Sequence, residues 1–454
     1  MTQPESHLFY QSRLRRPLVD RAEGIYIWDR SGKRYIDGSS GAMISNIGHS
    51  NPKVLEAMRK QMEKATFAYR LHFENEPAET LARRLVEYMP EGLDTVFFVS
   101  GGSEAVETCL KMARQYALAI GEPHRYKTIS RFPSYHGSTL GALAATGMAL
   151  MSAPFDPMLK QMPKIPAPTV YLDHNQRTPE EAGLYYADFL EEEILRQGPK
   201  TVLAFIMEPV GGASTGALVA PDCYYGRIRE ICDRYGVLLI YDEVMCGAGR
   251  TGRYYLGGSH WKAEPDLIAL SKGIASGYSP LGAMVTSGKM VDPVLDSGGF
   301  IHGFSYAGNP LACAAGLAVL EEIERQNLLT QAEQKGNLLK GHLEDLMQRF
   351  PFIGDVRGKG LLLAVEFVAD RETMEPLHPE LNAHNELVEM AFERGLIIYS
   401  RRTRGGRIGD HFLICPPLII EEEQIDELLG IFTGTFGRIC AETQAQVQLI
   451  GLTK

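Results

Sequence analysis

Residues 236–243 read Gly-Val-Leu-Leu-Ile-Tyr-Asp-Glu, an apolar run that ends in two carboxylates, Asp242 and Glu243. A second apolar run, Leu267–Leu270, is followed directly by Ser271-Lys272-Gly273. Short continuous runs of this kind are typical of strands that are buried on both faces of a parallel sheet. A carboxylate and an amine at the ends of buried strands are costly to leave unpaired. Either Asp242 and Lys272 pair with each other, or a charged group that is absent from the sequence lies between them.

Similar runs recur through the middle of the chain, separated by stretches with helical periodicity. The predicted strands are 95–99, 127–130, 202–207, 237–241, 267–270 and 281–285. The alternation predicts βαβ units, and therefore an α/β fold with a mostly parallel sheet flanked by helices.

The two ends of the chain have a different pattern. Residues 24–28 and 34–36 read as a hairpin, a long helix pattern begins near residue 312, and the last predicted helix covers 421–438. We expect a large domain over 61–330 and a smaller α+β domain, to which the N-terminal segment 1–60 and the C-terminal part 331–454 both contribute.

Composition excludes several classes of protein. The 454 residues carry a net charge of −10 and are 44% hydrophobic, so we expect a globular protein without a nucleic-acid or membrane partner. The seven cysteines are scattered and form no CxxC motif, which favours a reducing compartment over a disulfide framework or a zinc site. No secretory signal and no membrane-spanning run is visible, so we expect a cytoplasmic protein.

Polar and small residues follow five of the predicted strands. Ligands of open α/β sheets bind beyond the carboxyl ends of the strands, so these residues are candidates for one site. They are Gly101-Gly102-Ser103, Tyr135-His136-Gly137, Glu208, Asp242 and Lys272.

The loop at Gly101-Gly102-Ser103 opens a predicted helix. Close backbone approach at the glycines and free N–H groups at the helix start suit a phosphate. The alternative is an ordinary capping box formed by Ser100 with Glu104. Similarly, Tyr135 or His136 could stack on a flat heteroaromatic ring, or could be a core aromatic residue.

Asp242 and Lys272 suggest a specific cofactor. A lysine can form a Schiff base, and an aspartate can hold a pyridine nitrogen in its protonated form, so together they are the protein half of a pyridoxal phosphate site. The alternatives are a helix cap or buried salt bridge for Asp242 and a surface position for Lys272. The phosphate-type loop favours the cofactor.

The motif Gly247-Ala248-Gly249-Arg250-Thr251-Gly252 matches the glycine pattern of dinucleotide-binding proteins. That fingerprint also needs a helix opening at the motif and an acid about 20 residues further on. The following residues, 253–258, have no helical pattern, which argues against a dehydrogenase. No Walker A motif and no metal-ligand spacing appears, so no metal is expected.

With these residues identified, the chain resembles the class III, or omega-type, aminotransferases of the fold type I pyridoxal phosphate enzymes, over nearly its whole length. The blocks that carry the resemblance are 37–49, 100–105, 135–137, 208–209, 242–252, 271–273, 302–310 and 357–360.

The resemblance implies roles for the residues of the site. Lys272 would carry the cofactor as an internal aldimine and move protons between the substrate α-carbon and C4′ of the cofactor. Asp242 would bind the pyridinium nitrogen, and Val244 and Tyr135 would pack on the two faces of the ring. Gly102 and Ser103 would bind the phosphate, and His136 would contact the ring. Glu208 would orient Asp242 or the region of the ring hydroxyl. Ser305, in a position usually held by threonine, would reach the phosphate that is bound in the partner subunit. A homodimer with active sites at the interface is implied.

Departures from the usual family pattern concern the substrate side. Met245-Cys246 replaces a common Gln-Thr pair, which resembles the amine- and pyruvate-using branch. Met43 lies where that branch often has an aromatic pocket wall, so with Tyr135 it is a candidate substrate contact. The run 401–407 contains several arginines, and we favour Arg407 for a substrate carboxylate, with a solvated basic loop as the alternative.

The resemblance therefore predicts transamination between an amine or an omega- or beta-amino acid and a keto acid, with pyruvate favoured as acceptor. The alternatives are a 2-oxoglutarate-dependent omega-amino acid aminotransferase, an aminomutase or decarboxylating aminotransferase of the same fold, and a catalytically silent dimer.

Overall fold

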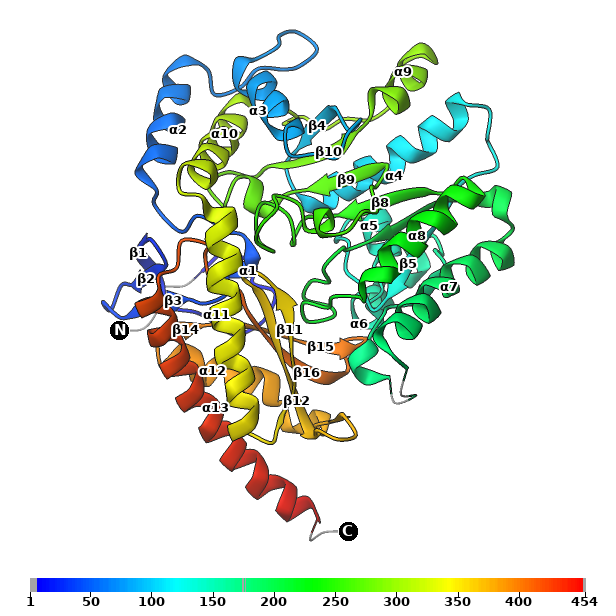
Figure 1. Cartoon of the computed structure of the whole chain (residues 1–454). Helices are drawn as coiled ribbons and strands as arrows, with labels where there is room; N and C mark the ends of the chain where they lie inside the picture. Colours follow the sequence, from blue (N-terminus) through cyan, green and yellow to red (C-terminus); the bar gives the residue numbers. More distant parts are fainter. Residues whose placement is uncertain (1–5, 174, 176, 452–454) are drawn as a thin grey trace.

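The computed structural model describes residues 6–173, 175 and 177–451 and contains one large sheet and two smaller ones (Figure 1). The large sheet has the strand order β4-β10-β9-β8-β7-β5-β6. Its strands are β4 (Thr95–Val99), β5 (Lys127–Phe132), β6 (Lys164–Pro166), β7 (Val202–Met207), β8 (Leu238–Asp242), β9 (Leu267–Leu270) and β10 (Gly282–Thr286). Neighbouring strands in the part β9-β8-β7-β5-β6 pair in parallel, whereas β10 is antiparallel to both β4 and β9. The predicted mostly parallel α/β sheet is confirmed.

Both faces of this sheet are covered, which explains why its strands are apolar without interruption. Leu239 and Tyr241 of β8 pack in one hydrophobic cluster with Tyr224 of α8 (Asp222–Tyr235). Ile240, between them, packs in a different cluster with Val106 of α4 (Gly102–Ala119). Since successive side chains of a strand point to opposite faces, residues 239–242 of β8 are all buried.

The remaining helices of this half surround the sheet (Figure 1). The helix α7 packs along α8, and α10 packs against α2 and α3. They are α2 (Pro52–Lys64), α3 (Glu76–Val86), α5 (Leu140–Ala145), α6 (Ala149–Ser152), α7 (Pro179–Gln197), α9 (Gly288–Asp296) and α10 (Pro310–Arg325). The helix expected from residue 312 begins two residues earlier, because Pro310 follows Asn309, whose side chain caps the helix by accepting from the Ala312 N–H at 3.0 Å.

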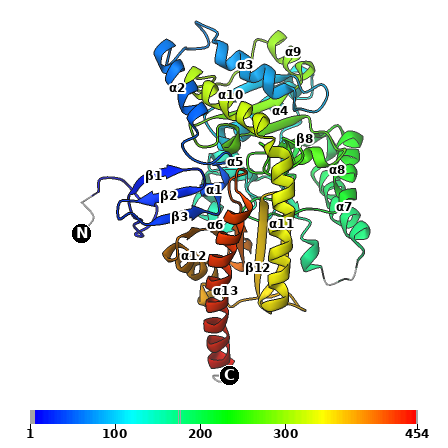
Figure 2. The same ribbon diagram turned by 60° about the vertical axis from the view of Figure 1, so that its left-hand side comes forward.

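The smaller part of the molecule is built from both ends of the chain. The hairpin predicted near the N-terminus is present as β2 and β3, and β3 pairs in parallel with β14 from the C-terminal region, with Ile36 opposite Leu396. This sheet consists of β1 (Val19–Glu23), β2 (Tyr26–Asp29), β3 (Arg34–Asp37) and β14 (Leu396–Ile397). The segment β1–β3 lies beside the C-terminal helices in Figure 2.

An antiparallel sheet and three helices complete this smaller part. The strands are β11 (Ile353–Lys359), β12 (Leu362–Asp370), β13 (Glu375–Pro376), β15 (Tyr399–Arg404) and β16 (Ile408–Ile414), and the helices are α11 (Leu328–Arg349), α12 (Ala383–Glu393) and α13 (Glu422–Gly451). Phe367 of β12, Phe412 of β16 and Phe436 of α13 form its aromatic core.

The last helix is longer than predicted, because no proline or glycine interrupts residues 438–450. The domain boundaries at 60 and 330 stay a prediction.

Candidate functional site: a cleft at the strand ends

A cleft of about 320 Å³ opens beyond the carboxyl ends of the parallel strands. It collects residues that lie far apart in the sequence, as expected where parallel strand ends meet. Of the residues predicted for the site, the cleft is lined by Met43, Gly102, Ser103, Tyr135, His136, Glu208, Asp242, Val244 and Lys272. Two predicted residues, Ser305 and Arg407, do not line it in the single chain.

Lys272 follows β9 and sits in a conformation that residues other than glycine rarely adopt. Its φ is 48°, in the left-handed region, and the next residue, Gly273, leaves no room for a side chain: an added Cβ would lie 2.3 Å from Asn46 Nδ2. The Lys272 amine makes no hydrogen bond or ion pair with any residue in the described part of the chain. Burial lowers the pKa of Lys272, and the carboxylates of Asp242 and Glu208 oppose that shift. The result is a half-buried amine with a reduced tendency to hold its proton.

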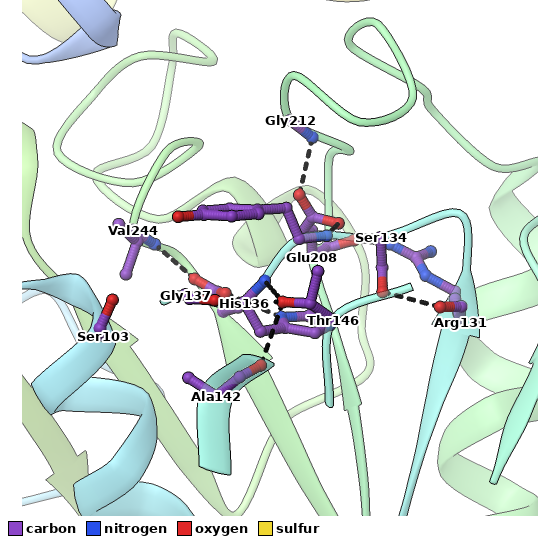
Figure 3. Close-up of polar contacts among 12 residues, drawn as sticks. Ser103, Arg131, Ser134, His136, Gly137, Ala142, Thr146, Glu208, Gly212 and Val244 are labelled. Atoms are coloured by element: carbon purple, nitrogen blue, oxygen red, sulfur yellow. Dashed lines mark hydrogen bonds and ion pairs between the residues drawn. The ribbon is translucent and has the colours of Figure 1, made fainter. Parts of the chain in front are cut away.

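Asp242 ends β8 and is held on both carboxylate oxygens. Its Oδ2 lies 2.9 Å from His136 Nδ1, and its Oδ1 accepts from the Val244 N–H at 3.1 Å. The backbone of His136 is itself fixed, since the backbone N–H of His136 donates to Thr146 Oγ1 at 2.9 Å (Figure 3). Asp242 and Lys272 therefore do not form an ion pair with each other, although both line the cleft.

Glu208 follows β7 and is also buried. Its Oε1 accepts from the Gly212 N–H at 3.0 Å, and its Oε2 accepts from the Tyr135 N–H at 3.4 Å (Figure 3). Burial raises the pKa of Glu208 above its ordinary value, and the Asp242 carboxylate adds to the shift, while His136 and Arg131 oppose it. Through these two hydrogen bonds, Glu208 connects the segment around Tyr135 with the loop that follows β7.

The glycine-rich loop after β4 opens α4. Gly101 is the N-cap residue, and the Glu104 carboxylate accepts from the Ser100 N–H at 2.8 Å, so half of the alternative capping box is present. The first N–H groups of a helix have no partner within it, which leaves those of Gly102 and Ser103 available to an anion. Gly102 must be a glycine, because an added Cβ would lie 2.8 Å from Val244 Cγ1.

The substrate side of the cleft is formed by residues that the strand-end pattern does not reveal. Apart from Met43 and Tyr135, the wall consists of Ala42, Met148, Met151, Ala213, Ser214, Met245, Tyr399 and Arg401. The guanidinium of Arg401 lies 4.3 Å from the centre of the Tyr399 ring. Arg407, which the sequence favoured, lies in the turn between β15 and β16 and does not line the cleft, whereas Arg401 does.

Ser305 is exposed, in a segment that also carries large exposed apolar side chains. Ile301 is 80% and Tyr306 is 65% exposed, and they lie beside the segment 67–73, where Leu71 and Phe73 are 73% and 69% exposed. The two segments touch, because the Phe67 and Tyr306 rings meet edge to face and Arg70 donates to the His302 carbonyl. We call Phe67, Leu71, Phe73, Ile301 and Tyr306 the apolar face.

The chemistry of the cleft fits pyridoxal phosphate. A half-buried amine without a partner among the described residues is available for a carbonyl carbon. A fixed, buried carboxylate is available for a protonated ring nitrogen, and a helix start is available for a phosphate. Within residues 6–173, 175 and 177–451, no cluster of three or more potential metal ligands occurs. None of the helices described has the length and apolar character needed to cross a bilayer.

Comparison with known proteins agrees with this chemistry. The profile of the family Aminotransferase class-III matches residues 10–436. The chain is 40% identical over 425 residues to the aminotransferase YodT of Bacillus subtilis, covering 93% of this chain and 95% of that protein. It is 34% identical to a putrescine–pyruvate aminotransferase of Pseudomonas aeruginosa, covering 95% of this chain and 92% of that protein.

A solved amine transaminase from an uncultivated Pseudomonas species, in its PLP-bound internal aldimine form, superimposes with a TM-score of 0.89 at 34% identity and covers 96% of this chain and 99% of its own. A family match over nearly the whole length, together with these relatives, establishes membership. The chain belongs to the class III aminotransferases, enzymes that depend on pyridoxal 5′-phosphate and catalyse transamination.

Proposed function

We propose that this enzyme transfers an amino group from an amine or an omega- or beta-amino acid to pyruvate, with Lys272 as the catalytic residue. The observation that carries the proposal is the Lys272 amine, half-buried in the same cleft as Asp242 and without a hydrogen-bond or ion-pair partner among the described residues. The putrescine–pyruvate and amine transaminase relatives support the choice of an amine donor and of pyruvate.

Bound pyridoxal phosphate supplies a covalent link to the substrate nitrogen and an electron-withdrawing ring that stabilises negative charge on the neighbouring carbon. For the proton transfer, Lys272 must be deprotonated at its Nζ. Burial lowers the pKa of this group, so the neutral amine is more populated near neutral pH than that of an exposed lysine. Lys272 would then take the proton from the substrate carbon that bears the amino group and deliver it to the cofactor, and in the second half of the reaction it would carry out the reverse transfer onto the carbon of the keto acid.

Asp242 keeps the ring nitrogen protonated in this proposal. Its carboxylate is held by the His136 ring and the Val244 N–H, so it does not need to reorganise when a cation binds. Gly102 and Ser103 bind the phosphate, and Tyr135 and Val244 enclose the ring. Glu208 supports the Tyr135 backbone from behind.

We further propose that the active unit is a homodimer. The apolar face gathers five exposed apolar side chains from two segments that touch, and it adjoins Ser305. A second copy covering this face would bring its own Ser305 toward the phosphate of the first subunit. On the substrate side, Arg401 is better situated than Arg407 to bind a carboxylate, because Arg401 lines the cleft.

The proposal is tested with purified enzyme, pyridoxal phosphate, an amine and pyruvate. Alanine should form together with the aldehyde or ketone of the donor. A donor panel of putrescine, β-alanine, taurine, ornithine and 1-phenylethylamine, each with pyruvate and with 2-oxoglutarate, identifies both substrates. Lys272→Ala should lower the rate by at least about 10³-fold, because no other amine is available for the proton transfer.

Reduction with borohydride, which fixes a Schiff base irreversibly, is a second test of the same variant. In the wild-type enzyme it should fix the cofactor to the peptide that contains Lys272, and in Lys272→Ala no cofactor should be fixed. Lys289→Ala, at an exposed lysine, is the matched control and should behave like the wild type. Cofactor fixed equally in Lys272→Ala, or carbon dioxide release without alanine formation, would refute the proposal.

A further inference from the structure

The glycine motif at 247–252 has a structural explanation that has nothing to do with nucleotides. Its central side chain, Arg250, has 0% exposure and is the largest fully buried side chain of the described residues. The surrounding glycines allow close packing: an added Cβ at Gly252 would lie 2.6 Å from the Glu333 nitrogen, and one at Gly247 would lie 2.7 Å from the Glu243 carbonyl oxygen. The motif thus buries an arginine at the junction of the two parts of the molecule.

Arg250 joins segments from three regions of the chain. Its Nη1 donates to the carbonyl oxygens of Pro416 at 2.5 Å and Cys415 at 3.3 Å. Its Nη2 donates to Asn46 Oδ1 at 2.5 Å and to Ser40 Oγ at 3.1 Å. The N-terminal segment, the loop after β8 and the C-terminal segment therefore meet on one guanidinium group.

None of these acceptors is a carboxylate, and no salt bridge to Arg250 is found in the part of the chain that the structure describes. An ionised group that is buried without a counter-ion carries a large desolvation cost. Burial lowers the pKa of Arg250 to about 10, so the group still carries its charge at neutral pH. A purely structural junction does not require a charge, since neutral residues could join the same segments.

The contact with Asn46 connects Arg250 to the catalytic lysine. The Asn46 side chain donates from Nδ2 to the Ala248 carbonyl at 2.9 Å, while its Oδ1 accepts from Arg250. The same Nδ2 fills the space where Gly273 would carry a side chain. Asn46 is therefore fixed between Arg250 and the Lys272–Gly273 turn, whose left-handed conformation needs support from its surroundings.

We propose that Arg250 is a positioning residue for Lys272: it fixes Asn46 against the Lys272–Gly273 turn, and its buried positive charge, separated from that turn by the Asn46 side chain, acts on the Lys272 amine. The inference rests on the proposed role of Lys272 as the cofactor lysine.

The charged and titratable groups that act on Lys272 support an electrostatic effect. Asp242 at the end of β8 and Glu208 after β7 favour protonated Lys272, whereas Arg250 disfavours it. The remaining neighbour, Cys415, is neutral at physiological pH, because burial raises the pKa of its thiol to about 11. Arg250 is thus a positive charge that adds to the effect of burial and, against the two carboxylates, favours the neutral amine.

The test is a pH titration of the visible absorbance of the holoenzyme, which reports the protonation of the Lys272 nitrogen. Arg250→Gln removes the charge and should raise the pH midpoint by about one unit. Asn46→Asp supplies the missing carboxylate and should shift the midpoint in the same direction. Arg250→Lys keeps the charge and should shift it by less than half as much, although its melting temperature should fall.

Arg253→Gln is the matched control, because it makes the same change at an exposed arginine of the same loop and should leave the midpoint unchanged. Asn46→Asp decides the question if Arg250→Gln yields no folded protein. A wild-type midpoint in folded, cofactor-loaded Asn46→Asp or Arg250→Gln, or an equal shift in Arg253→Gln, would overturn the inference. If Lys272 is not the cofactor lysine, the wild-type enzyme itself will show no borohydride-fixed cofactor on that residue, so the two failures are distinguishable.

Discussion

Several side chains of the cleft are held in place by hydrogen bonds to neighbouring residues. His136 is an example, because its ring is buried and its Nδ1 lies 2.9 Å from Asp242 Oδ2. The other ring nitrogen, Nε2, has no hydrogen-bond partner among the described residues, so Asp242 is the only such partner of this ring among them. Removing such a partner leaves a buried carboxylate unsatisfied, which costs more than the hydrogen bond itself contributes. His136 should therefore affect both the stability of the fold and the affinity for the cofactor.

This leads to a prediction for two substitutions of similar size. His136→Leu should lower the free energy of unfolding by about 1–3 kcal/mol and weaken pyridoxal phosphate binding, because Asp242 Oδ2 loses its partner and only the Val244 N–H still holds the carboxylate. His136→Asn retains an N–H donor and should lose less on both measures. Urea denaturation of the apoenzyme and titration with the cofactor measure the two effects. Equal losses in the two variants would show that the hydrogen bond is unimportant.

At the scale of secondary-structure elements, the packing of α7 against α8 distinguishes two glycines that look alike in the sequence. Gly226 lies inside α8 with nothing within 4 Å of an added Cβ, and its φ is negative. Gly183 lies inside α7, where an added Cβ would come within 2.4 Å of Cys223 Sγ and 3.0 Å of Pro221 Cβ.

Gly226→Ala should therefore stabilise the protein by about 0.5–1 kcal/mol, because alanine restricts the unfolded chain and favours the helix. Gly183→Ala makes the same chemical change but should destabilise by about 1–3 kcal/mol, since the two helices must move apart. Thermal unfolding of the two variants beside the wild type gives the comparison. A stabilised Gly183→Ala variant would contradict the close packing of these helices.

At the scale of the whole molecule, two histidines couple folding to pH. Burial lowers the pKa of His260 and of His302 to about 4, and nearby lysines add to both shifts. Between about pH 6.5 and pH 4, the unfolded chain takes up protons at these residues that the folded protein does not. Stability should therefore fall as the pH drops through this window.

We expect each of the two histidines to contribute about 1–2 kcal/mol of this loss. Urea unfolding at pH 7 and pH 5 measures it, and the double variant His260→Gln/His302→Gln should show a weaker pH dependence. His124→Gln, at an exposed histidine, serves as the control. An unchanged slope in the double variant would exclude these residues as the source.

The sequence was sufficient to predict most of the large sheet and the residues that line the cleft at the strand ends. Strands such as β4, β7 and β9 begin and end where their apolar runs do, and the residues after them converge because parallel strand ends meet at one edge. The reversed direction of β10 could not be read from its apolar run, since a strand that is buried on both faces looks the same in either direction.

The substrate side could not be predicted for a physical reason. Met148 and Arg401 reach the cleft from a short helical turn and a hairpin, and no periodic pattern relates them. What brings them together is close packing: an added Cβ at Gly406, in the turn after β15, would lie 3.2 Å from Met148 Cε. The same packing leaves Arg407 exposed, so spacing alone could not choose among the arginines of 401–407.

The parallel pairing of β3 with β14 has a consequence for the synthesis of the chain. Ile36 leaves the ribosome about 360 residues before Leu396, its partner in the sheet. At roughly 5–20 residues per second, the edge of β3 waits about 20–70 s for that partner. During this interval Asn46 also lacks the C-terminal segment that its backbone carbonyl contacts at Leu418. The Lys272–Gly273 turn therefore gains its full support only after Leu418 has been synthesised, well after the turn itself has left the ribosome.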